Sequence, residues 1–267
     1  MSEIVVTGSG VWSAAGAGLA AFRESVFSGK GPRRIDTIGA RGFPVLSAPD
    51  PTPFPRFPQA RRMDRAVHLA LAAADAAWTN ARLSSVDPTR IAILLGNSRG
   101  PAGTWCEAPS PSRLRPSRAA NTAIASLSGA LSLAFQILGP SMVVSAACAS
   151  AAHAIALGAG LLLGGEADVV LAGGAEAPIV EPLLEQFDAA GILGSHPNPL
   201  LACRPFDRTR NGTVPGEGAG FLTLETADHA RRRGVPALAR LAGYATGSEA
   251  HNRVAARSDG AGLARVV

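Results

Sequence analysis

Lysine is almost missing from this sequence, since Lys30 is the only lysine among 25 Lys and Arg residues. Arginine therefore supplies nearly all of the positive charge behind the formal net charge of +5. A basic balance allows nucleic acid, a membrane surface or an acidic protein as partner. However, the arginines are scattered over Pro-rich loops and predicted helix ends and form no stripe. We therefore expect ordinary solvated charge and no nucleic-acid partner, and an acidic protein is the partner class that stays open.

Cysteine is also scarce, with only Cys106, Cys148 and Cys203. Three residues without metal-ligand spacing predict neither a metal site nor a disulfide framework, so we expect a reduced, cytoplasmic protein. The first residues lack the basic and apolar regions of a signal peptide. Charged residues are absent from 119–165, but Gly139-Pro140 and several polar residues interrupt this stretch. It is better interpreted as buried core than as a membrane span, and we expect no membrane partner.

Apolar patterning predicts an α/β chain in which residues 1–267 form one domain. The predicted strands cover 4–7, 90–96, 142–144 and 169–172, and the predicted helices cover 18–27, 62–83, 119–138 and 149–163. Two more strands, 218–224 and 237–246, enclose a short helix at 227–233, and we expect this pair to be antiparallel at the sheet edge. Residues 35–61 and 178–204 are predicted to be irregular. This order indicates one mixed sheet with helices on both faces.

Cys148 comes just before the helix predicted at 149–163. Backbone N–H groups at the start of a helix lack internal partners and stabilise a thiolate, which favours a nucleophile. Free cysteines are also common as small buried hydrophobes, so position alone leaves both roles open. The helix itself is rich in Ala and Leu and has no polar face, so it needs cover on every side.

The run Ser145-Ala-Ala-Cys-Ala-Ser-Ala-Ala-His153 resembles the nucleophile elbow of the β-ketoacyl-acyl-carrier-protein synthases, enzymes of the thiolase fold. ADVVLAGGAE at 167–176 and PFDRTRNGTVPGEGAG at 205–220 are similar to later motifs of that family, in the same order. Asn211 and Thr213 depart from the family's Asp and Phe. The resemblance covers the whole chain but only the N-terminal half of the family's length. It implies one half of the thiolase fold, with the order βαβαβαββ.

The same resemblance implies roles for individual residues. Cys148 stands at the position of the acyl-carrying nucleophile, and Phe187 matches an aromatic residue that lines the acyl pocket. In the dimers of this family, the position of Arg118 lies beside the acyl tunnel of the partner subunit and holds an aromatic residue. Trp105 is a second candidate for a tunnel gate. His153 is expected to make a buried structural hydrogen bond. No bound cofactor is implied, because acyl chains arrive on the phosphopantetheine of an acyl carrier protein.

Ketosynthases also need two histidines and a supporting lysine for decarboxylation, and in the family these lie in the C-terminal half. His196, His229 and His251 stand in none of those motifs. A thiolate alone can accept an acyl group but cannot drive decarboxylation, because catalysis needs the full constellation. We therefore expect a non-catalytic subunit similar to the chain length factor of type II polyketide synthases, including polyene-type pathways, that forms a heterodimer with a full-length ketosynthase.

Chain length factors usually replace the cysteine, whereas this chain keeps Cys148. An alternative therefore stays open: a β-ketoacyl synthase with Cys148 as nucleophile, truncated or completed by another chain.

Overall fold

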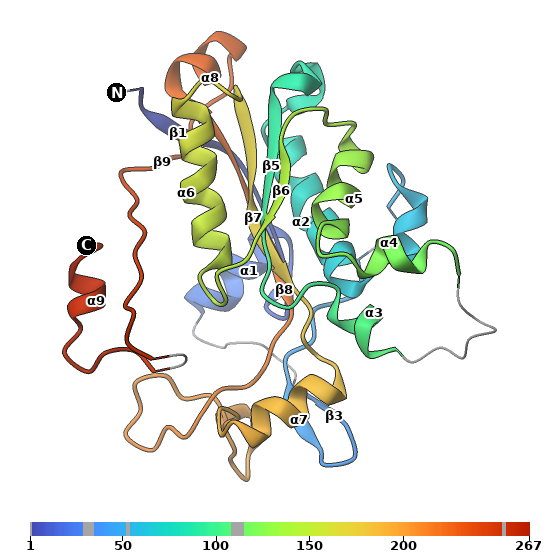
Figure 1. The fold of residues 1–267 in the computed structure, drawn as a ribbon, viewed down its shortest axis with the longest axis vertical. Coiled ribbons are helices and arrows are strands. Elements are labelled where there is room, and N and C mark those ends of the chain that lie inside the picture. Colours follow the sequence, from blue (N-terminus) through green and yellow to red (C-terminus); the bar gives the residue numbers. More distant parts are fainter. Residues whose placement is uncertain (1, 29–34, 52–53, 108–114, 253–254) are drawn as a thin grey trace.

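The computed structural model describes residues 2–28, 35–51, 54–107, 115–252 and 255–267 (Figure 1). Its main feature is a mixed sheet with the strand order β2-β1-β8-β7-β5-β6, in which β9 pairs with β1 as well. The strands are β1 (Ile4–Ser13), β2 (Gly16–Ala17), β5 (Ile91–Gly96), β6 (Ser141–Val144), β7 (Val169–Glu176), β8 (Gly218–Thr226) and β9 (Ala239–Arg240). β5 is parallel to both β6 and β7, whereas β8 is antiparallel to β7 and β1. The predicted mixed α/β sheet is therefore confirmed.

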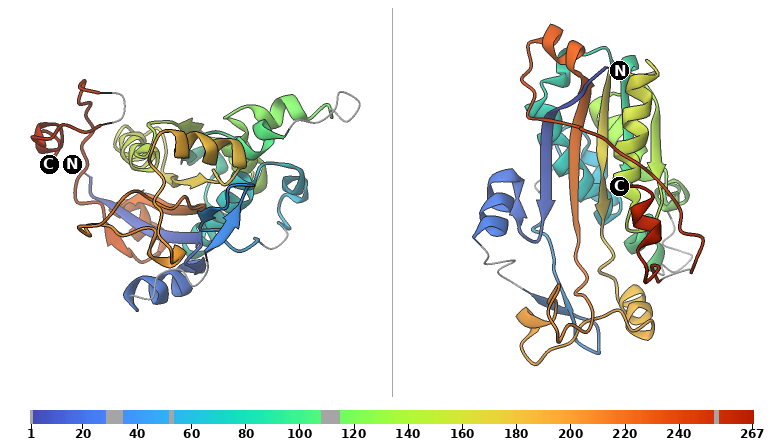
Figure 2. Two further views of the ribbon diagram at one scale, coloured as in Figure 1. Left: turned by 90° about the horizontal axis from the view of Figure 1, so that it is seen from below. Right: turned by 90° about the vertical axis from the view of Figure 1, so that its left-hand side faces the viewer.

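Helices cover both faces of this sheet (Figures 1 and 2). One face carries α2 (Arg65–Asn80) and α5 (Ser126–Phe135), and the larger apolar core lies between them and the strands. The other face carries α6 (Ser150–Leu163) over a smaller core. β5 is buried along its whole length because it lies between these two layers. The carboxylate of Asp64 starts α2 by accepting the N–H of Ala66 at 2.9 Å.

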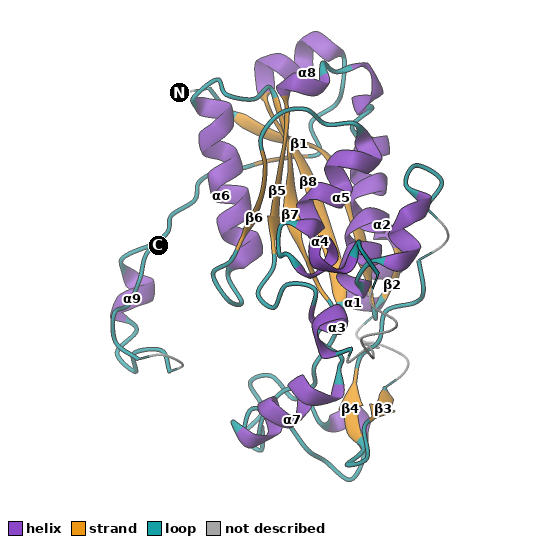
Figure 3. Cartoon of the chain, turned by 45° about the vertical axis from the view of Figure 1, so that its right-hand side comes forward, coloured by secondary structure: helices purple, strands orange, loops and turns teal. Residues whose placement is uncertain are grey.

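Shorter elements surround the sheet (Figure 3). α1 (Gly18–Phe27) follows β2, and α8 (Ala227–Arg233) follows β8. The hairpin of β3 (Asp36–Ile38) and β4 (Phe43–Val45) shares a small apolar cluster with α7 (Glu181–Ala189). Among the described residues, the remaining α-helices are α3 (Ala102–Cys106), α4 (Arg118–Thr122) and α9 (Ala261–Ala264).

The outer side of α6 is an apolar surface. Gly158 lets the inner side approach β7, since a Cβ there would lie 2.9 Å from Val170 Cγ1. On the outer side Leu157 and Leu163 remain 51% and 43% exposed. The sequence predicts that this helix needs cover on every side. In the structure, the other described residues leave its outer face uncovered.

Several predicted elements were wrong in extent. The helix predicted at 119–138 is two helices, α4 and α5, because Ala123 takes an extended conformation with ψ of 136°. The strand predicted at 237–246 is reduced to β9. β8 does not lie at the edge and does not pair with β9, since it runs between β1 and β7. The segments predicted to be irregular contain the β3–β4 hairpin and α7, whose packing partners are distant in sequence.

Candidate functional site

The parallel strands β5, β6 and β7 end on the same side of the sheet, and the candidate site lies there. The Cys148 turn follows β6, the turn at 97–100 follows β5, and Glu176 closes β7. In Figure 1 this is the end of the sheet that faces α7. Ligands of open α/β sheets bind outside the carboxyl ends of the strands, so the topology itself selects this end.

The turn that carries Cys148 has the geometry of an elbow between a strand and a helix. Ala147 has a φ of 49°, an uncommon value for a residue with a side chain. Ser150 holds the turn closed, since its Oγ accepts the N–H of Ala146 at 2.9 Å and donates to the carbonyl of Ala147 at 2.6 Å. Cys148 is exposed at the tip. The alternative of a small buried hydrophobe is therefore wrong for this residue.

Two glycines bring the start of α6 directly onto the strand ends. A Cβ on Gly96 would stand 2.3 Å from the backbone nitrogen of Ala151, and one on Gly174 would stand 2.9 Å from Ala151 Cβ. Real side chains do not reach such distances, so both positions need glycine for this packing. The closeness of α6 to β5 and β7 thus fixes where the Cys148 turn emerges.

The turn after β5 is fastened to the end of β7 by two polar side chains. Asn97 is fully buried, and its Nδ2 donates to the carbonyl of Ala175 at 2.7 Å. Its Oδ1 accepts the N–H groups of Arg99 and Gly100. The Glu176 carboxylate accepts the N–H of Ser98. Burial raises the pKa of Glu176 above its ordinary value, and the hydrogen bond from Ser98 opposes this rise.

Sequence reasoning missed Asn97 and Glu176 as site residues. A signal was present, because each polar residue stands at or directly after the end of a buried strand. What the sequence did not show is that β5 and β7 are neighbours, which brings the two residues together.

Phe187 lies on α7, half-buried against the cluster of Phe43, Val45 and Leu184. The guanidinium of Arg99 stands over its ring, 5.1 Å from the centroid. The structure therefore joins Phe187 to the turn after β5 through an arginine that sequence reasoning did not single out. Its place in an acyl pocket stays a prediction.

Arg118 and Trp105 occupy a separate region, around α3 and α4. The Arg118 guanidinium donates to the carbonyls of Thr104 at 2.6 Å and Glu107 at 2.7 Å, and to the Glu107 carboxylate at 3.3 Å. Trp105 is 65% exposed on α3. Arg118 thus holds the end of α3, and the tunnel roles of Arg118 and Trp105 stay predictions.

The histidines do not gather at this site. The His153 ring is half-buried and makes no hydrogen bond with any residue that the structure describes, so the predicted structural hydrogen bond is wrong. His196 bonds within its own loop, to Asn198. His229 contacts Glu225, near the opposite end of β8. In the described part of the chain, no three His, Cys, Asp or Glu side chains are grouped as metal ligands. Nor does any helix there have the length and apolar character to cross a membrane.

Comparison with known proteins settles the family. Residues 1–230 match the family model of the N-terminal domain of β-ketoacyl synthases. The chain belongs to the β-ketoacyl synthase family. It is 31% identical to 3-oxoacyl-[acyl-carrier-protein] synthase 2 of Rhizobium meliloti (strain 1021), over 99% of this chain and 69% of that protein. It is also 31% identical to the chloroplastic synthase II of Arabidopsis thaliana, over 98% of this chain and 51% of that protein. The chain thus spans between about half and two thirds of the length of these curated relatives.

Solved structures give the same assignment. The ishigamide ketosynthase/chain length factor superimposes with a TM-score of 0.88 at 27% identity, covering 99% of this β-ketoacyl synthase chain and 69% of that one. AntDE:AntF, a type II polyketide synthase acyl carrier protein in complex with its ketosynthase bound to the hexaketide, gives a TM-score of 0.86 at 26% identity, over 99% and 68% of the two chains. The fold is therefore that of the thiolase-like ketosynthases, and the predicted resemblance is confirmed.

Proposed function

We propose that this chain is a ketosynthase-like subunit, a chain length factor, that pairs with a full-length ketosynthase in type II polyketide biosynthesis. The family and the likeness to type II polyketide ketosynthases support this direction. A relative named as a putative polyketide β-ketoacyl synthase 1, from Streptomyces halstedii, is 33% identical over 99% of the chain. The observation that carries the proposal is the edge of the sheet at β6.

β6 pairs with β5 on one side, and no strand of the described chain pairs with its other side. Proteins normally cover or protect such an edge, because its free N–H and C=O groups invite another strand. Apolar side chains surround it, with Met142 on β6 44% exposed, Leu133 on α5 57% and Leu138 between them 71%. An open strand within an exposed apolar surface suits a second ketosynthase-type subunit that extends the sheet.

A basic pocket beside α4 supports the proposed carrier partner. Arg62, Arg115 and Arg118 line a pocket of about 310 Å³ that also contains Thr104, Glu107, Ser117 and Asn121. Guanidinium groups bind phosphate through paired hydrogen bonds. Because Arg118 is already bonded to Thr104 and Glu107, Arg62 and Arg115 would bind the phosphate of a phosphopantetheine arm, and their positive charge would attract an acidic carrier protein.

A second function is favoured by one observation, the exposed Cys148 in an intact elbow. In this alternative the Cys148 thiolate attacks the thioester carbonyl of a carrier-bound acyl group. A carbon–sulfur bond forms to Cys148, the bond to the pantetheine sulfur breaks, and that sulfur leaves as a thiolate and takes up a proton. The groups for decarboxylation would come from elsewhere in the assembly.

Co-expression with full-length type II ketosynthases tests the proposed pairing. We expect a stable complex that Met142→Lys disrupts, because a charge on β6 cannot be buried in the extended sheet without a partner. Val26→Lys is the matched control, since Val26 is 54% exposed on α1, away from β6. Absence of a complex with any such ketosynthase, or equal effects of the two variants, would contradict the proposal.

The role of Cys148 is tested in the same complex. A non-catalytic subunit predicts that Cys148→Ala leaves product formation nearly unchanged, as does Cys203→Ala, which removes another exposed thiol. If Cys148→Ala abolishes turnover while the complex still forms, the enzyme alternative is correct.

A further inference from the structure

Arg99 is an exposed arginine on a turn whose backbone is firmly held. Asn97 accepts the N–H of Arg99 at 3.1 Å, and Asn97 itself is fully buried and bonded to Ala175. Glu176 accepts the N–H of the preceding residue, Ser98. Gly100 completes the turn with a φ of 65°, which favours glycine. The position from which the Arg99 side chain starts is thus fixed by the ends of β5 and β7.

The guanidinium of Arg99 has an aromatic neighbour but no ionic one. It stands 5.1 Å from the centroid of Phe187. Among the residues that the structure describes, no carboxylate lies within ion-pair distance of it. Arg99 is close enough to the Glu176 carboxylate to lower the pKa of that group, but the carboxylate accepts its hydrogen bond from the N–H of Ser98. A guanidinium stacked on a ring keeps the donors at its edge free for a carboxylate or carbonyl oxygen.

The turn of Arg99 adjoins the turn of Cys148. The N–H of Asn97 donates to the carbonyl of Val144 at 3.0 Å, at the end of the strand that leads into the elbow. Gly96 lies against the backbone of Ser150 and Ala151, at the start of α6. Arg99, which has no ion-pair partner among the described residues, therefore lies on a turn that is bonded to the end of the strand leading into the Cys148 elbow.

We propose that Arg99, stacked on Phe187, is a specificity-determining residue that favours acyl groups bearing a carboxylate or several carbonyl oxygens over saturated alkyl chains at the Cys148 end of the sheet. A carboxylate or carbonyl would satisfy the guanidinium, whereas an alkyl chain would cover a charge without pairing it, which is costly. The inference rests on the second function described above in one respect, that acyl groups reach the exposed Cys148 thiol.

The charge preference can be measured on the purified chain through the Cys148 thiol. Cys106→Ser and Cys203→Ser leave Cys148 as the only thiol. Two aromatic disulfides serve as probes: dithiobis-nitrobenzoate, which carries two carboxylates, and dithiodipyridine, which is neutral. The measured quantity is the second-order rate constant for dithiobis-nitrobenzoate divided by that for dithiodipyridine. We expect Arg99→Gln to lower this ratio about threefold or more at low salt, and the effect to shrink at high salt.

Two variants separate the proposal from a general charge effect. Arg99→Lys retains the positive charge and should keep most of the ratio. Arg232→Gln removes the same charge from α8, near the opposite end of the sheet, and should leave the ratio unchanged. An unchanged ratio in Arg99→Gln, or an equal fall in Arg232→Gln, would overturn the proposal. The proposal would also be overturned if Cys148 reacted with neither probe.

The outcome is independent of the test for the ketosynthase partner. If the complex forms but the ratio does not depend on Arg99, the specificity inference fails alone. If the ratio depends on Arg99 but no ketosynthase binds, the proposed function fails and the local preference stands.

Discussion

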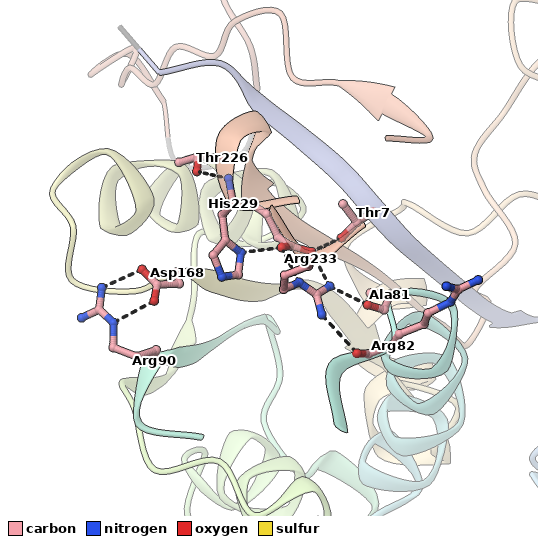
Figure 4. Close-up of polar contacts among 9 residues, drawn as sticks. Thr7, Ala81, Arg82, Arg90, Asp168, Thr226, His229 and Arg233 are labelled. Atoms are coloured by element: carbon pink, nitrogen blue, oxygen red, sulfur yellow. Dashed lines mark hydrogen bonds and ion pairs between the residues drawn. The ribbon is translucent and has the colours of Figure 1, made fainter. Parts of the chain in front are cut away.

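We expect replacement of Arg233 to lower the stability of the protein strongly, because Arg233 neutralises a carboxylate that has no access to water. Glu225 is fully buried on β8 and accepts hydrogen bonds from Thr7 Oγ1 at 2.5 Å and His229 Nδ1 at 2.6 Å. Arg233 reaches it from α8 with Nε at 3.0 Å and Nη2 at 2.9 Å. The same guanidinium donates to the carbonyls of Ala81 and Arg82, which ties α8 to the end of α2 (Figure 4).

Replacing Arg233 by Met keeps much of the side-chain stem but leaves the Glu225 carboxylate without its guanidinium partner. Breaking a buried ion pair from one side costs about 3–5 kcal/mol, since the remaining charge stays desolvated. For a chain of this size, 1 kcal/mol lowers the melting temperature by about 2–4 °C. We therefore expect the melting temperature of Arg233→Met, followed by circular dichroism, to fall by roughly 6–20 °C.

The control is Arg231→Met, which removes a neighbouring arginine on α8. Arg231 pairs with Asp228 at 2.8 Å, but the two side chains are 74% and 66% exposed, so the pair contributes at most about 0.5 kcal/mol. Adding Glu225→Gln to Arg233→Met should recover part of the loss, because the buried charge is then gone. If Arg233→Met has the same melting temperature as Arg231→Met, or if adding Glu225→Gln lowers the melting temperature further, the buried-charge argument is wrong.

Two further predictions concern the candidate site, and a third concerns Arg118. Because burial raises the pKa of Glu176, its contribution to stability is complete below the ordinary value of 4.5 and is lost as pH rises through the raised pKa. In urea unfolding, the stability of Glu176→Gln should therefore rise relative to that of the wild type toward neutral pH. The reverse trend would contradict this prediction. Gly96→Ala places a Cβ 2.3 Å from the Ala151 nitrogen and should cost about 1–3 kcal/mol by denaturant unfolding, whereas Gly129→Ala, with open space around it, should not destabilise. Arg118→Phe should change product chain length in the ketosynthase complex, measured by mass spectrometry, and an unchanged product profile would remove the tunnel role.

Elements with strong local signals were predictable from the sequence. The helix predicted at 227–233 has the same bounds as α8, because Thr226 caps its first turn and Gly234 follows its end with a φ of 67°. The break at Ala123 had no such signal, since neither proline nor glycine marks it. The same limit applies to β8, whose place between β1 and β7 depends on pairings distant in sequence.

The candidate site divides in the same way. A motif of consecutive residues was enough to predict an elbow at Cys148, and the structure has an exposed thiol there. The role of Cys148 as a nucleophile stays a prediction. The contacts around it join separate strands: Asn97 to Ala175, Glu176 to Ser98, and Arg99 to Phe187. None of these pairs follows from periodicity or spacing, because each needs the strand order first.

The strand order also explains why an elbow on a short strand can hold a defined shape. β6 has four residues and pairs with a single strand of the described chain, so pairing alone gives it little stability. The elbow is held instead from the α6 side, where Gly96 and Gly174 admit the first turn of the helix and Ser150 closes the loop. The geometry at Cys148 therefore depends more on the packing of α6 against β5 and β7 than on β6 itself. A partner that extends the sheet at β6 could therefore bind or leave without displacing the Cys148 thiol.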